Sequence, residues 1–209
     1  MKLNLPNRLT LLRLCLVPVF IVVGMLPDTV IPFYVSCVVC AVLFIATAIT
    51  DMLDGKIARR DNLITDFGKF MDPIADKFMV IGAMFVILYK FEHLRTIMIF
   101  MLLVVVFREL AVTSMRLVVS TGENIVIAAN ILGKLKTVAQ IVAVSAVFLE
   151  PVVQKIFVTV MRACGSEMTL IRIDIVPITW VALAFSAIMT VWSGINYLAA
   201  YWKYLDPQK

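Results

Sequence analysis

Long apolar runs recur along the chain, and short polar stretches separate them. Six runs cover residues 9–26, 31–50, 70–89, 96–119, 137–160 and 174–202. Each is close to the ~20 residues that a helix needs to cross a bilayer, and none alternates apolar and polar residues as barrel strands do. Because backbone groups in lipid must pair within their own segment, the pattern predicts six transmembrane helices.

Composition supports the membrane class over a soluble one. Of the 209 residues, 62% are hydrophobic and 16% are charged, and the mean hydropathy is +1.01. Such values are typical of integral membrane proteins. We see no repeat and no separate soluble domain, so we expect one all-α domain over residues 1–209, embedded in the lipid bilayer and without a nucleic-acid partner.

The distribution of Lys and Arg predicts the orientation. With six spans, 14 of the 19 cations lie on the side of both termini, and the other side holds only Lys90, Arg95, Lys155, Arg162 and Arg172. Cytoplasmic loops carry the excess of positive charge. We therefore expect a multi-pass protein of the cell membrane with both termini in the cytoplasm.

One stretch, "DMLDGKIARRDNLITDFGKFMDPIADK" at residues 51–77, holds six of the aspartates. Asp51 and Asp54 lie three residues apart near the end of the second run. Asp72 and Asp76 lie four apart at the start of the third, so each pair shares a helical face. If the two helices form a hairpin, four carboxylates converge at the cytoplasmic side, where they require cations.

A pair of divalent metal ions is the natural partner for these acids. His93 is the only histidine, and the cysteines lie mostly in apolar helix, so the ligands are oxygen atoms, which favour Mg²⁺ or Mn²⁺. Four carboxylates suffice for two ions and for phosphoryl chemistry. The alternative is a cytoplasmic loop with ordinary ion pairs, which two acid pairs at helical spacing make the weaker interpretation.

Small residues and one arginine accompany the acids. Gly55 and Ala58 follow the first pair, and Gly68 lies four residues before Asp72, which leaves space beside the metals. Arg59 is placed to bind a phosphate. Either Thr65 or Asp66 caps the third helix.

The acids and small residues together fit D-x-x-D-G-x-x-A-R-x8-G-x3-D-x3-D, and the chain thereby resembles the CDP-alcohol phosphotransferases. This resemblance implies a six-helix enzyme, commonly a homodimer, that uses two divalent ions to move a phosphatidyl or similar group from a CDP-linked donor to an alcohol and releases CMP. It implies metal ligands at Asp51, Asp54, Asp72 and Asp76. It implies CDP-diacylglycerol contacts at Asp51, Asp54, Gly55, Ala58, Arg59 and Gly68.

Four segments resemble the bacterial members whose acceptor is glycerol 3-phosphate: "PNRLTLLR" at 6–13, "TDFGKFMDPIADK" at 65–77, "FREL" at 107–110 and "GKLKT" at 133–137. A phosphate-bearing acceptor needs a basic pocket beside the metals. Our candidates for acceptor contacts are Thr10, Arg13, Arg108, Arg116, Lys134 and Lys136. Either lysine could instead extend to lipid headgroups, because residues two apart on a helix point to opposite sides.

In the expected reaction Asp72 and Asp76 are catalytic, and Asp76 accepts the proton of the attacking hydroxyl. Two alternatives stay open. One is another acceptor, such as phosphatidylglycerol, inositol phosphate or serine, although the basic cluster and the "FREL" and "GKLKT" segments favour glycerol 3-phosphate. An ion-coupled transporter also uses acids at membrane depth, but here the acids gather at one membrane face.

Overall fold

The computed structural model describes residues 4–60, 65–122, 131–164 and 176–202. Within these ranges all regular secondary structure is helical, which confirms the predicted all-α class. The elements are α1 (Leu5–Met25), α2 (Phe33–Arg60), α3 (Asp66–Lys90), the 3₁₀ turn η1 (Glu92–Leu94), α4 (Arg95–Gly122), α5 (Ile131–Ala163) and α6 (Pro177–Tyr201).

Local sequence signals place several helix starts. Pro6 and Pro177 lie in the first turns of α1 and α6, where a missing backbone N–H costs nothing. Thr65 is the N-cap of α3, and its hydroxyl accepts a hydrogen bond from the Gly68 backbone N–H at 3.1 Å. Of the two predicted caps, Thr65 is therefore the one used, and Asp66 begins the helix.

Five of the six long helices are apolar enough to cross a membrane. They are Pro6–Met25, Phe33–Leu53, Glu92–Val119, Ile131–Ala163 and Pro177–Tyr201. The 25-residue α3 is long enough, but Asp72, Asp76 and Lys77 put too many charged side chains into it. The predicted third span is thus the helix that carries the second acid pair, while α2 continues to Arg60 and carries the first pair within the same helix.

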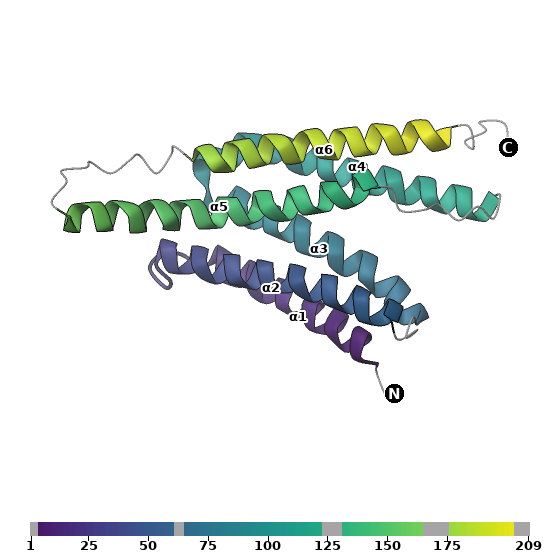
Figure 1. Cartoon of the computed structure of the whole chain (residues 1–209), viewed down its shortest axis with the longest axis horizontal. Coiled ribbons are helices and arrows are strands. Elements are labelled where there is room, and N and C mark those ends of the chain that lie inside the picture. Colours follow the sequence, from purple (N-terminus) through teal and green to yellow (C-terminus); the bar gives the residue numbers. More distant parts are fainter. Residues whose placement is uncertain (1–3, 61–64, 123–130, 165–175, 203–209) are drawn as a thin grey trace.

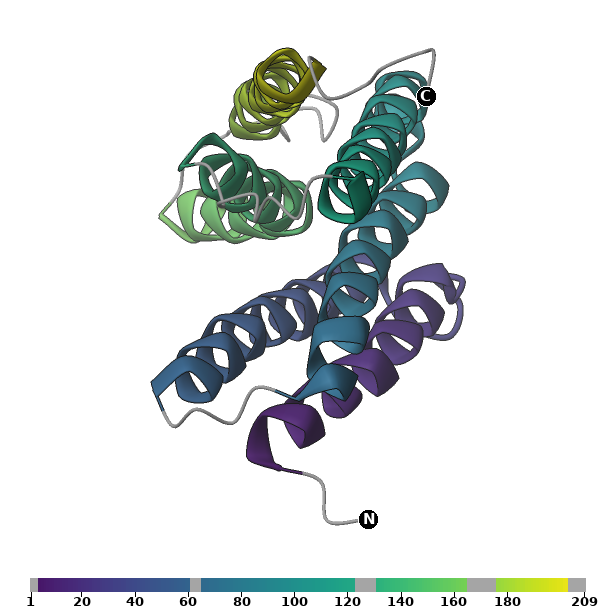
Figure 2. The same ribbon diagram turned by 90° about the vertical axis from the view of Figure 1, so that its right-hand side faces the viewer.

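The helices form two groups joined by α3. Figure 1 shows α1 and α2 side by side and α4, α5 and α6 together, with α3 running obliquely between the groups. The same crossing is visible in Figure 2, and α3 contacts α1, α4 and α5. The start of α1 and the end of α6 lie toward the same end of the long axis (Figure 1).

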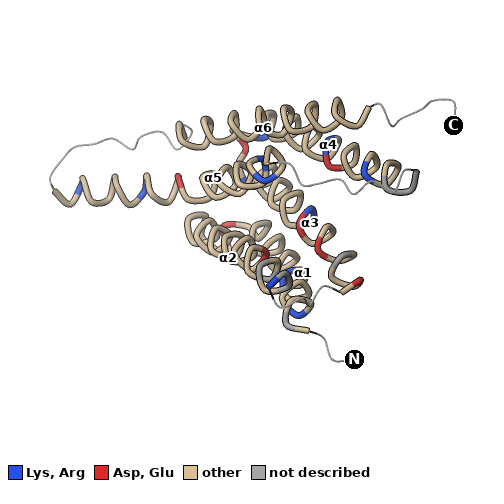
Figure 3. The backbone as a smooth tube through the Cα atoms, turned by 45° about the vertical axis from the view of Figure 1, so that its right-hand side comes forward, with Lys and Arg blue, Asp and Glu red and all other residues tan. Residues whose placement is uncertain are grey.

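An aromatic core fills the half of the bundle away from that end. The ring of Phe148 meets Phe20 at 5.8 Å and Phe91 at 5.7 Å between centroids, and Phe20 meets Phe44 at 6.1 Å. All four rings are buried, and they tie α5 to the first three helices. Figure 3 shows charged residues of α3, α4 and the first turns of α5 toward the opposite half. The aromatic core therefore stabilises the bundle in one half, and the polar region lies in the other.

Candidate active site

A polar cavity of about 430 Å³ opens between α2 and α3 on one side and α4, α5 and α6 on the other. The predicted site residues that line it are Asp51, Asp72, Asp76, Arg108, Arg116, Lys134 and Lys136. Carboxylates and cations that lie far apart in sequence thus share one cavity. We call Asp51, Asp72 and Asp76 the acid wall, and Arg108, Arg116, Lys134 and Lys136 the basic wall.

Helix α1 supports the acid wall from behind. The guanidinium of Arg13, which is fully buried, forms an ion pair with Asp51. The hydroxyl of Thr10, also buried, donates a hydrogen bond to Asp72 Oδ1 at 2.8 Å. We had expected Thr10 and Arg13 among the acceptor contacts, yet neither lines the cavity, and both contact aspartates that were predicted as metal ligands.

Gly68 lies at the packing contact between α1 and α3. A Cβ atom there would lie 3.2 Å from Asn7 Oδ1 and 3.3 Å from Thr65 Oγ1. The Thr65 hydroxyl also donates to Asn7 Oδ1 at 2.9 Å. Asn7 therefore occupies the space that we expected for a ligand beside Gly68. The only sequence signal for Asn7 was its place in the "PNRLTLLR" segment.

Part of the signature lies outside the described residues. The side chains of Asp54, Ala58 and Arg59 are not described, although their backbones belong to α2, and Gly55 is partly buried in the same helix. Their predicted contacts with metal or with CDP-diacylglycerol accordingly stay predictions.

The donor set of the acid wall suits a hard cation, because it consists of carboxylate oxygens that open onto one cavity. Within the described residues, however, no three Asp, Glu, His or Cys side chains lie close enough together to hold one ion. Two of the acids are bound instead to Arg13 and Thr10, and the side chain of Asp54 is not described. The chemistry of these carboxylate ligands fits the predicted metal ions.

The basic wall comes from α4 and α5. Lys136 is 6% exposed, whereas Lys134 is exposed. The two lysines therefore differ in environment, as their spacing of two residues predicted, yet both line the cavity. Arg116 is also exposed at the cavity.

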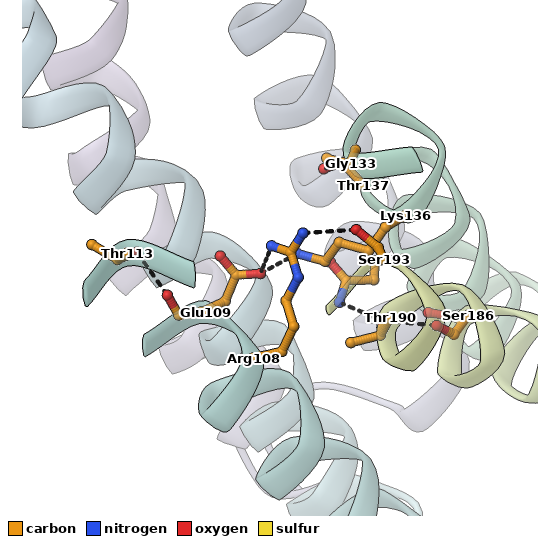
Figure 4. Close-up of polar contacts among 10 residues, drawn as sticks. Arg108, Glu109, Thr113, Gly133, Lys136, Thr137, Ser186, Thr190 and Ser193 are labelled. Atoms are coloured by element: carbon orange, nitrogen blue, oxygen red, sulfur yellow. Dashed lines mark hydrogen bonds and ion pairs between the residues drawn. The ribbon is translucent and has the colours of Figure 1, made fainter. Parts of the chain in front are cut away.

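Glu109 lies among these cations, and we had assigned it no role. Its Oε1 atom accepts hydrogen bonds from Lys136 Nζ and, at 3.0 Å, from Arg108 Nη1 (Figure 4). Arg108 Nη2 donates to Ser193 Oγ of α6 at 2.8 Å. At Gly194 an added Cβ would lie 3.1 Å from Arg108 Cγ, so α6 both binds and confines this arginine. Glu109 could have been noticed in the sequence, because it directly follows Arg108 in "FREL". Nothing in the sequence of α6 indicated that Ser193 would contact Arg108.

A second, apolar cavity of about 410 Å³ lies between α4 and α6. It shares Arg108 and Val112 with the polar cavity. Leu103, Phe107 and Val191 line it and are largely exposed on the outer surface of the helices. An apolar groove thus opens directly beside the basic wall.

The sequence is similar to those of known proteins. The sequence profile of the family described as "CDP-alcohol phosphatidyltransferase" matches residues 3–192. Two full-length relatives, both named CDP-diacylglycerol–glycerol-3-phosphate 3-phosphatidyltransferase, come from Bacillus subtilis (39% identical, covering 97% of each chain) and Escherichia coli K12 (32% identical, covering 96% of each chain). A relative of the same name from Wigglesworthia glossinidia brevipalpis is 40% identical over 69% of this chain and 76% of its own. The chain therefore belongs to the CDP-alcohol phosphatidyltransferase family of phosphotransferase enzymes.

Proposed function

We propose that the protein transfers the phosphatidyl group of CDP-diacylglycerol to sn-glycerol 3-phosphate, which yields phosphatidylglycerophosphate and CMP. The observation that carries the proposal is the single cavity in which the acid wall faces the basic wall. The names of the relatives from B. subtilis and E. coli supply the same donor and acceptor. The reaction would belong to phospholipid synthesis in the membrane.

The acid wall would serve the donor. Asp51, Asp54, Asp72 and Asp76 would hold two divalent cations, Mg²⁺ or Mn²⁺, whose chemistry is to neutralise the diphosphate and the charge that develops on it. Arg59 and the small residues of the signature would receive the cytidine nucleotide. In this role the exposed position of Asp72 at the cavity leaves its carboxylate open to a ligand.

The transfer itself is an in-line displacement. Asp76 lines the cavity and accepts the proton of the glycerol hydroxyl. At the same time the oxygen of that hydroxyl bonds to the phosphorus that carries diacylglycerol. The bond from that phosphorus to the bridging oxygen breaks, and CMP leaves with the electron pair. Asp72 and Asp76 are the residues that we assign to catalysis.

The basic wall would hold the acceptor phosphate, which carries about two negative charges. Arginine offers a planar fork of N–H donors that matches phosphate oxygens, and the ammonium of lysine adds a point charge. Arg108, Arg116, Lys134 and Lys136 all line the cavity and supply both kinds of donor. This charge is what distinguishes glycerol 3-phosphate from uncharged or zwitterionic alcohols.

Thr10 and Arg13 receive a revised role in this proposal. Their contacts with Asp72 and Asp51 favour positioning of the metal-binding carboxylates over direct contact with the acceptor. We assign both residues to support of the acid wall.

The acceptor assignment is tested by release of CMP from CDP-diacylglycerol by the purified full-length protein with Mg²⁺ or Mn²⁺. Glycerol 3-phosphate, inositol phosphate, serine and phosphatidylglycerol are compared at equal concentration. We expect release only with glycerol 3-phosphate, and none after chelation of the metal. Preference for another acceptor would move the protein to another activity of the family, and metal-independent release would remove the two-metal mechanism.

We further propose that the protein is a homodimer whose cavity opens to the cytoplasm. The family resemblance and the charge distribution support this arrangement. A cysteine introduced at Arg60, which is exposed at the end of α2 beyond the apolar span Phe33–Leu53, in a chain without its four native cysteines should react with a membrane-impermeant maleimide from the cytoplasmic side. Reaction only from the opposite side would reverse the orientation, and a monomeric mass in detergent would exclude the dimer.

A further inference from the structure

Glu109 is the one acid among the residues that form the basic side of the polar cavity. One of its oxygen atoms, Oε1, binds both Lys136 of α5 and Arg108 of its own helix α4 (Figure 4). Arg108 in turn reaches Ser193 of α6. A single carboxylate thus lies at the centre of a network that joins three helices.

All three charged side chains are largely removed from solvent. The exposed fractions are 14% for Glu109, 12% for Arg108 and 7% for Lys136. Buried cations are costly unless they are paired, and removal of one partner leaves the other uncompensated. Two cations and one carboxylate still leave a net positive charge, so the trio can attract an anion while each member has a partner.

The contacts leave donor capacity on both cations. An ammonium group has three N–H donors, and Lys136 directs one of them to Glu109. Arg108 uses two terminal nitrogens for Glu109 and Ser193, while its buried Nε has no hydrogen-bond partner within the described residues. Glu109 therefore fixes where the cations lie without using all their donors.

We propose that Glu109 is a positioning residue for the acceptor: it holds Lys136 and Arg108 at the cavity in the geometry that binds the acceptor phosphate. The inference rests on the proposed function. Glu109 does not itself touch the acceptor, because its carboxylate would repel a phosphate, and it acts through the two cations that it binds.

The chain offers a matched control in Glu150. This acid of α5 is 6% exposed and accepts backbone hydrogen bonds from Ile178 at 3.1 Å and Thr179 at 2.6 Å. Like Glu109 it joins two helices, but it does not line the polar cavity. If Glu109 had only the structural role of a buried acid, Glu109→Gln and Glu150→Gln should therefore have the same effect on the enzyme.

The experiment compares four variants of the full-length enzyme: Glu109→Gln, Lys136→Met, the double variant and Glu150→Gln. The readouts are the apparent KM for glycerol 3-phosphate, the apparent KM for CDP-diacylglycerol and the melting temperature. We expect Glu109→Gln to raise the KM for glycerol 3-phosphate by about tenfold and to leave the KM for the lipid within about twofold. Glu150→Gln should lower the melting temperature and change neither KM.

The double variant decides whether Glu109 acts through Lys136. If it does, Glu109→Gln raises the KM for glycerol 3-phosphate less in the Lys136→Met background than in the wild type, because residues that act as a unit are not additive. The remaining rise then acts through Arg108. Fully additive effects, or equal effects on both substrates, would overturn the inference. If Glu109→Gln alone does not fold, the double variant is compared with Lys136→Met, and a KM that is at least about tenfold higher in the double variant is then the contradicting result.

The wild-type enzyme reports separately on the proposed function. If it releases CMP with glycerol 3-phosphate as acceptor, the variants test Glu109. If it does not use glycerol 3-phosphate at all, the proposed function fails before any variant is compared.

Discussion

The two walls of the polar cavity carry opposite charge, yet each is built with a buried counter-charge. On the acid wall, Arg13 of α1 pairs with Asp51, and Thr10 binds Asp72. On the basic wall, Glu109 pairs with Arg108 and Lys136. The difference lies in exposure, since Asp51 is 41% exposed while Lys136 is only 7% exposed. The paired Asp51 is therefore open to ligands and the paired Lys136 is enclosed, whereas Lys134 and Arg116 of the basic wall are exposed at the cavity.

The comparison assigns chemistry to one wall and acceptor selection to the other. A variant in the acid wall should then reduce the rate whatever the acceptor. A variant in the basic wall should affect one substrate more than the other.

Asp72→Asn should reduce CMP release by at least about 100-fold, because a lost metal ligand removes several kcal/mol of charge stabilisation in the transition state. Initial rates at saturating substrates and Mg²⁺ provide the measurement. Asp28→Asn is the control, since Asp28 is exposed and pairs only weakly with Lys90 at 3.5 Å. A normal rate for Asp72→Asn would exclude Asp72 from the metal site.

Arg108→Gln should raise the KM for glycerol 3-phosphate by ~10- to 100-fold, the value of about 1.5–3 kcal/mol for a hydrogen bond to a charged group. The KM for CDP-diacylglycerol should change little. Steady-state kinetics with each substrate varied in turn separates the two. Arg95→Gln, at an exposed arginine of the same helix, should behave as wild type. Equal changes in both KM values would remove Arg108 from the acceptor pocket.

Thr10→Val should lower kcat/KM by about tenfold, because it removes one hydrogen bond from a hydroxyl to the Asp72 carboxylate and retains the shape of the side chain. The Mg²⁺ concentration for half-maximal rate should rise as well, since Asp72 loses its support. A Mg²⁺ titration checks both effects. Thr159→Val provides the control, because that exposed hydroxyl bonds only to a carbonyl of its own helix. An unchanged Mg²⁺ requirement would contradict the support role.

We expect an acyl chain of the donor to lie in the apolar groove between α4 and α6, because this groove shares Arg108 and Val112 with the polar cavity. Val191→Trp should then fill part of the groove and raise the KM for long-chain CDP-diacylglycerol by about two- to tenfold. A donor with short acyl chains should be affected less, because it occupies less of the groove. Val181→Trp on the same helix is the control, since Val181 is 71% exposed and does not line the groove. If Val191→Trp raised the KM for the long-chain donor no more than Val181→Trp does, the groove would be excluded as an acyl-chain site.

Gly194→Ala should have the smallest effect, a rise of about two- to fivefold in the KM for glycerol 3-phosphate. The added Cβ would lie 3.1 Å from Arg108 Cγ, a contact that displaces the flexible side chain by a few tenths of an ångström. At Gly82 the added Cβ would lie 3.0 Å from Ile21 in the core, so Gly82→Ala should lower the melting temperature and leave KM unchanged. If the two variants showed the same pattern, Gly194 would have no specific link to the acceptor.

Much of the fold was predictable from local patterns. Apolar runs and helical spacing located the six helices, and short-range capping rules narrowed the cap of the third helix to Thr65 or Asp66. The spacing of Asp72 and Asp76 likewise placed both on one face, and both line the cavity. These features depend on residues within a turn or two of one another.

The contacts between helices could not be read in the same way. The pairing of Arg13 with Asp51, and of Arg108 with Ser193, depends on the register of helices far apart in sequence. Gly68 was expected to leave space, but the neighbouring helix supplies Asn7 to fill it. A single sequence indicates which residues share a helix face. It does not indicate which faces of two helices pack against each other.

The central claim is that the acid wall and the basic wall act on two substrates of one transfer. The most direct test follows isotope-labelled glycerol 3-phosphate into lipid and CMP into solution in the same reaction of purified enzyme. We expect one lipid-bound label for each CMP, in the presence of Mg²⁺ or Mn²⁺ and not after chelation. Release of CMP without label in the lipid, or incorporation of label without metal, would contradict it.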